Sequence, residues 1–116
     1  MVNRGALLLR YKEPAVRWIN EADPYPTGHL HKLDEVNEER TVYLVDDTVG
    51  DTPASLNRWL RKNYGPLFEA ELEGWYTDPD LWPQDRTFKL FQKWFQPELH
   101  TVLFDLVGSE MHDDET

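Results

Sequence analysis

Cysteine is absent from the 116-residue sequence. Its absence excludes a disulfide framework, a thiolate zinc site, an iron–sulfur cluster and a cysteine nucleophile. Because thiols stay reduced and disulfides are rare in the cytosol, a chain without cysteine is consistent with a cytoplasmic protein. A cytoplasmic location is therefore our expectation.

Long apolar runs and basic residues are also scarce. The longest purely apolar run near the start covers residues 6–9, whereas a signal-peptide core needs about 7–15 residues and a membrane span about 20. Against 12 Lys and Arg stand 22 Asp and Glu, so the net charge is −10 at neutral pH. This charge would repel nucleic acid and anionic lipid. We expect a soluble protein with no nucleic-acid or membrane partner, and the acidity favours a basic protein partner.

Familiar catalytic and nucleotide-binding motifs are missing as well. The two serines, Ser55 and Ser109, lie outside any Gly-x-Ser-x-Gly motif. The six glycines are scattered, with no Gly-x-Gly and no phosphate-binding loop. The sequence therefore predicts no cofactor and contains no motif that implies an enzymatic activity.

The chain does contain enough apolar residues to fold. Hydrophobic residues make up 40% of it and aromatic residues 13%, and its length is ordinary for one domain. No repeat or low-complexity tract divides it. We expect a single globular domain over residues 1–107 and an acidic, disordered tail over residues 108–116.

Periodic segments separated by eight prolines predict the secondary structure. Apolar or alternating runs predict strands over residues 6–11, 41–45 and 99–107. Apolar residues at helical spacing predict helices that begin near Pro14, Pro53 and Thr87.

The middle of the chain is ambiguous. Gly65 is expected to end the helix that begins at Pro53. Residues 66–75 fit a strand or a short helix, and their glutamate and alanine content favours the helix. Because strands joined through helices favour a parallel or mixed sheet, the predicted fold class is α+β. A small mixed sheet with helices packed on it, such as a ferredoxin-like variant, fits this order of elements.

One short pattern has metal-ligating character. His29 and His31 point to the same side of an extended segment, and Asp34 and Glu35 follow closely. Such nitrogen and oxygen donors suit a first-row metal ion. The alternative is a pair of solvated histidines in a polar loop. The candidate metal ligands are His29, His31 and Asp34.

The aromatic residues suggest a docking site. Five tryptophans exceed what a small core usually holds. Tyr76 and Trp82 lie at or within the proline-bracketed loop of residues 77–84, where periodicity gives no reason for burial. Trp and Tyr dominate interface hot spots, and nearby carboxylates would attract a basic partner. The alternative is that Trp82 folds back against its own loop. The candidate partner-binding residues are Tyr76, Asp78, Asp80, Trp82 and Asp85.

His100 supports a further alternative. It lies on the apolar face of the last predicted strand, where a neighbouring carboxylate would make it the general base of a small hydrolase. The sequence nevertheless favours a non-enzymatic protein-interaction or regulatory domain. A small-ligand or metal-binding domain is the next alternative, and the surplus of aromatic residues is also compatible with a homodimer.

Overall fold

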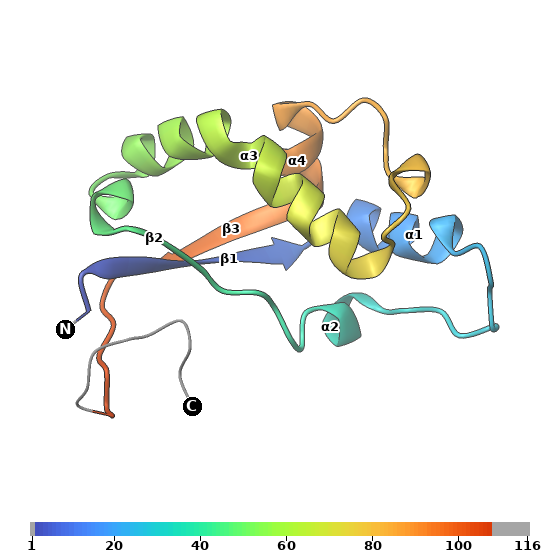
Figure 1. Cartoon of the computed structure of the whole chain (residues 1–116), viewed down its shortest axis with the longest axis horizontal. Helices are drawn as coiled ribbons and strands as arrows, with labels where there is room; N and C mark the ends of the chain where they lie inside the picture. The colour runs from blue at the N-terminus through green and yellow to red at the C-terminus, as the bar shows by residue number, and fades with distance from the viewer. Residues whose placement is uncertain (1, 108–116) are drawn as a thin grey trace.

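The computed structural model describes residues 2–107, which form a three-stranded sheet with helices packed on one face (Figure 1). The strands are β1 (Arg4–Tyr11), β2 (Tyr43–Asp46) and β3 (Phe95–His100). The helices are α1 (Glu13–Ala22), α2 (Leu33–Val36), α3 (Pro53–Trp75) and α4 (Phe88–Trp94), and short 3₁₀ turns cover Asp47–Gly50 (η1) and Pro79–Leu81 (η2). The α+β class is confirmed. The predicted tail over residues 108–116 lies outside the described residues.

The sheet has the order β2-β1-β3 and is antiparallel throughout, rather than mixed. Asn37, in the segment that leads into β2, helps to set the direction of that strand. Its Oδ1 accepts the backbone N–H of Tyr11 at 2.8 Å, and its Nδ2 donates to the Tyr11 carbonyl at 3.1 Å. The chain therefore enters β2 from the end at which β1 leaves the sheet. The ferredoxin-like pattern β-α-β-β-α-β has four strands, whereas the described residues form three.

The core lies between the sheet and the helices. Its β1 residues are Leu7, Leu9 and Tyr11, all buried on the face toward the helices. Phe68 of α3 is fully buried. Its ring centroid lies 5.4–5.8 Å from those of Phe91, Trp94 and Phe95. This aromatic cluster joins α3, α4 and β3.

Helix α3 continues through Gly65 and Pro66, so the helix end predicted at Gly65 is wrong. The helix begins as expected, with the Thr52 side chain accepting the backbone N–H of Ser55. A proline inside a helix costs about 3 kcal/mol, whereas burial of one large apolar side chain contributes about 1.5–3 kcal/mol. The buried residues of α3 lie on both sides of the proline: Leu60, Leu67, Phe68 and Leu72. Their combined burial outweighs the proline, and residues 66–75 are helical, as their composition favoured.

The last strand begins earlier than predicted. It covers residues 95–100 instead of 99–107. Pro97 lacks an N–H, but β3 is an edge strand, where a missing donor is tolerated. Phe95 is buried, whereas Val102, Phe104 and Leu106 are largely exposed. Phe95, at the start of β3, therefore contributes to the core, whereas the apolar residues that follow the strand do not.

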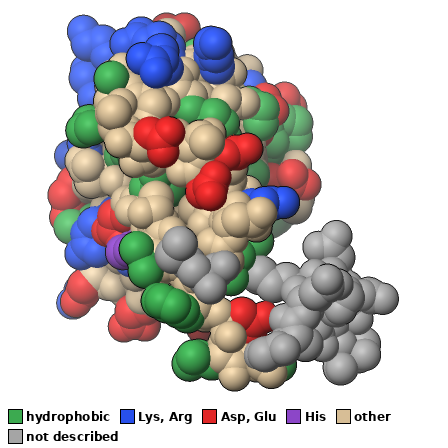
Figure 2. Space-filling model, turned by 90° about the vertical axis from the view of Figure 1, so that its left-hand side faces the viewer, with side chains coloured by type: hydrophobic (Ala, Val, Ile, Leu, Met, Phe, Trp, Pro, Cys, Tyr) green, Lys and Arg blue, Asp and Glu red, His purple; other side chains and the backbone are tan. Residues whose placement is uncertain are grey.

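Charges are segregated along α3. Its first half carries the exposed basic residues Arg58, Arg61 and Lys62. Its second half carries the acidic residues Glu69, Glu71 and Glu73. Figure 2 shows Lys and Arg side chains gathered at the top of the molecule, where Figure 1 places α3 and α4. The helix thus presents opposite charges at its two ends.

Candidate functional site

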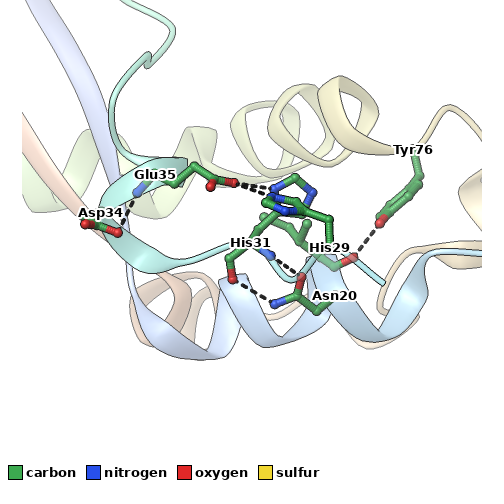
Figure 3. Close-up of polar contacts among 7 residues, drawn as sticks. Asn20, His29, His31, Asp34, Glu35 and Tyr76 are labelled. Carbon is green, nitrogen blue, oxygen red and sulfur yellow. Dashed lines mark hydrogen bonds and ion pairs between the residues drawn. The ribbon is translucent and has the colours of Figure 1, made fainter. Parts of the chain in front are cut away.

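The segment between α1 and α2 brings His29 and His31 together with Glu35 (Figure 3). Glu35 Oε1 lies 3.1 Å from His29 Nε2 and 2.9 Å from His31 Nδ1. The potential ligand atoms of the three residues all lie within 4.8 Å of one another. Hydrogen bonds from His29, and then from His31, hold the pKa of Glu35 below its ordinary value. Both predicted histidines are therefore in one cluster, which is centred on the Glu35 carboxylate.

Neighbouring groups hold this cluster in place. Asn20 of α1 accepts the backbone N–H of His31 at 2.8 Å and donates to its carbonyl at 3.1 Å. The His31 ring packs edge-on against Trp75 of α3, with centroids 5.3 Å apart. Gly28 has a φ of 88°, a conformation that favours glycine, and it turns the chain just before His29. The cluster is thus positioned by α1, α3 and a local turn.

Asp34, the predicted third ligand, lies outside the cluster. Its carboxylate accepts the backbone N–H of Glu35 at 2.9 Å and points away from the histidines (Figure 3). Successive residues of a helix differ in direction by about 100°, so adjacent acids face different neighbours. In the sequence, Glu35 follows His31 by four residues, and the turn of the chain into α2 brings its carboxylate back to the His31 ring.

An acidic groove lies beside the cluster, between residues 31–41 and the second half of α3. Two adjoining cavities of about 360 and 200 Å³ share Val36, Glu39 and Trp75 in their walls. The carboxylates in these walls are Glu35, Glu38, Glu39 and Glu71. Arg40 is the one Lys or Arg among the described wall residues, and it lies 3.1 Å from Glu98 of β3. The groove therefore combines four acidic side chains and one arginine with the rings of Tyr11, His31 and Trp75.

Glu71 connects the groove to the sheet. It accepts hydrogen bonds from the hydroxyl of Tyr11, at 2.7 Å, and from that of Tyr43. Trp75 Nε1 donates to the Tyr11 hydroxyl at 3.0 Å. Burial, together with the Glu71 carboxylate, raises the pKa of Tyr11 and of Tyr43 above the ordinary value. The two tyrosines and Glu71 thus anchor the second half of α3.

The raised pKa of Tyr43 predicts a loss of stability at high pH. Above about pH 10, the ordinary tyrosine pKa, the unfolded chain releases the Tyr43 proton while the folded chain retains it. The unfolding free energy therefore falls as pH rises above about 10, and is unaffected by this group at lower pH. Urea denaturation between about pH 8 and 11 measures this dependence. Tyr43→Phe should decline less steeply; a slope equal to that of the wild type would contradict the assignment.

The loop after α3 directs its two aromatic rings inward. Tyr76 and Trp82 are both half-buried. Trp82 Nε1 donates to the Tyr76 carbonyl at 2.7 Å, and the Tyr76 hydroxyl donates to the Ile19 carbonyl. The Tyr76 ring also packs edge-on against Trp18, at 5.3 Å. The exposed members of the predicted docking site are its acids, Asp78, Asp80 and Asp85. The loop thus offers carboxylates at its surface, while its rings hold it against α1.

His100 is exposed at the end of β3, opposite Ala6. Its ring has no hydrogen-bond or ion-pair partner within residues 2–107. The acid two residues before it, Glu98, lies 3.1 Å from Arg40 and 3.9 Å from Arg10. A histidine–carboxylate pair of the kind a hydrolase needs is therefore not assembled around His100 in the described part of the chain.

The chain was compared with known protein families, curated proteins and solved structures. No protein-family model, curated protein or solved structure matches the chain. Within residues 2–107, every helix is too short or too polar to cross a membrane. A function must therefore be argued from the acidic groove and the histidine cluster beside it.

Proposed function

We propose that this chain is a non-enzymatic protein-interaction domain that binds a basic segment of a partner protein in the acidic groove. The observation that carries the proposal is the meeting of four carboxylates and the half-buried Trp75 in one groove. Carboxylates form charge-assisted hydrogen bonds with arginine and lysine. A tryptophan face attracts the same cations through its ring quadrupole. This combination suits an arginine or lysine side chain.

The charge distribution supports a basic partner. The whole chain carries a net charge of −10, so a second copy would be repelled and a basic protein attracted. The acidic second half of α3 borders the groove, whereas its basic first half would repel a cationic segment. Complementary charge of this kind chiefly sets the orientation of binding and raises the association rate.

The loop carboxylates have a supporting part in this proposal. Trp75 lines both cavities of the groove, whereas Tyr76 and Trp82 are not among its described wall residues, so the aromatic anchor of the proposed site is Trp75. The exposed acids of the loop that follows α3 add long-range attraction: Asp78, Asp80 and Asp85. Charges outside the contact area mainly affect the association rate and its salt dependence.

The test is isothermal titration calorimetry with a short peptide in which arginine alternates with glycine. The matched peptide contains citrulline, which has nearly the shape of arginine but no charge. We expect a dissociation constant in the micromolar range for the arginine peptide, on the order of 8 kcal/mol of binding free energy. The citrulline peptide should bind at least about tenfold more weakly. Equal affinities would contradict the proposal.

Variants locate the binding site. The double variant Glu38→Gln, Glu39→Gln removes two exposed carboxylates of the groove. Each exposed ion pair contributes up to about 1 kcal/mol, so affinity should fall about tenfold. Glu21→Gln, an exposed acid on α1, is the control and should leave affinity unchanged. An equal loss in both proteins would place the binding outside the groove.

A further inference from the structure

We propose that His29, His31 and Glu35 form a binding site for a divalent first-row transition-metal ion, of which Zn²⁺ fits best. Two imidazole nitrogens and one carboxylate oxygen are donors that Zn²⁺ binds readily. Three protein ligands leave the fourth position of a tetrahedral ion for water. The site shares Glu35 with the groove, but metal binding requires neither the other three carboxylates nor Trp75 as a cation-binding surface.

Two of the three separations between the donor atoms are close to those around a single bound ion. With metal–ligand distances of about 2.0–2.2 Å, the donors of a tetrahedral site stand about 3.3–3.6 Å apart. Glu35 Oε1 lies 3.1 Å from His29 Nε2 and 2.9 Å from His31 Nδ1. These two contacts need to lengthen by only a few tenths of an ångström. The two histidine rings are also close, with centroids 5.0 Å apart, and rotation of their side chains adjusts the remaining separation.

The surroundings hold the ligands near this arrangement before an ion binds. Asn20 fixes the backbone of His31 through two hydrogen bonds, and Trp75 supports its ring. Contacts that orient metal ligands in this way typically change affinity 10–100-fold. The side chains of His29 and Glu35 are 60% and 41% exposed. An ion therefore reaches the site directly from solvent.

Titration of the untagged full chain with ZnCl₂, and separately with CoCl₂, tests the inference. We expect one Zn²⁺ ion per chain with a dissociation constant in the micromolar range. We also expect visible absorption bands of four-coordinate Co²⁺, which Zn²⁺ displaces. The absence of saturable Zn²⁺ binding, or a purely six-coordinate Co²⁺ spectrum, would overturn the proposal.

Two ligand variants and two controls assign the site. His29→Ala and Glu35→Gln alter exposed or half-exposed side chains, and each should weaken Zn²⁺ binding about tenfold or more. Asp34→Asn removes the adjacent carboxylate outside the cluster, and His100→Gln removes a distant histidine; both should keep the wild-type affinity. Circular dichroism verifies that every variant is folded. Binding that survives both ligand variants, or that is lost equally in Asp34→Asn, would overturn the assignment.

Discussion

Phe68→Ala is expected to lower the free energy of unfolding by about 3–5 kcal/mol. Phe68 has no exposed surface, and its ring packs against Phe91, Trp94 and Phe95. The substitution leaves a cavity where α3, α4 and β3 meet, and the three surrounding rings cannot all move to fill it. Domains are commonly stable by only about 5–15 kcal/mol. The expected loss is therefore a large part of the total.

Urea denaturation followed by circular dichroism measures this loss. Phe88→Ala is the matched control, because Phe88 belongs to the same aromatic group but is only half-buried. It should cost about half as much or less, since less apolar area is returned to water. A greater loss in Phe88→Ala than in Phe68→Ala would mean that the aromatic cluster is not the centre of the core.

Glu71→Ala should destabilise the protein by about 2–4 kcal/mol. The substitution removes the acceptor of two tyrosine hydroxyls, those of Tyr11 and Tyr43. A hydrogen bond to a charged group contributes about 1.5–3 kcal/mol, and the two hydroxyl protons left without an acceptor add to the loss. The second half of α3 would thus lose its carboxylate connection to β1 and β2, and only the Trp75–Tyr11 hydrogen bond to β1 described above would remain.

Glu69→Ala provides the control on the same helix. Glu69 is exposed, and its carboxylate lies 3.1 Å from Arg86. An exposed ion pair of this kind contributes about 0–1 kcal/mol. The denaturation midpoint of Glu69→Ala should therefore stay close to that of the wild type. Similar losses in the two variants would show that the tyrosine–carboxylate contacts do not stabilise the fold.

Local patterns predicted the starts of several elements. The threonine–proline sequence at residues 52–53 favours a helix start, because Thr52 caps the first turn and Pro53 needs no N–H partner. The direction of β2 is not local, since it depends on Asn37 binding the backbone of Tyr11, 26 residues away. The continuity of α3 through Pro66 likewise depends on distant residues, because Phe68 and Leu72 are buried by other core side chains.

The candidate sites were predictable only in part. The His-x-His pattern indicated two of three cluster members, but the choice between Asp34 and Glu35 depends on where α2 begins and which way its residues point. The groove was not predictable, because its walls come from segments far apart in the sequence: Tyr11 of β1, residues 31–41 and the end of α3. In the loop of residues 77–84, Trp82 had no periodic reason for burial. Its indole N–H finds a backbone carbonyl instead, which allows a loop side chain to pack inward.

The most direct test of the proposed function is to map where a cationic peptide binds. Two-dimensional ¹H–¹⁵N NMR spectra of the full chain, titrated with the arginine–glycine peptide, report each backbone amide and each tryptophan indole. The proposal predicts that the Trp75 indole signal and the amides of residues 35–41 shift together and saturate. Shifts confined to residues 77–84, with the Trp75 indole unmoved, would contradict binding in the groove.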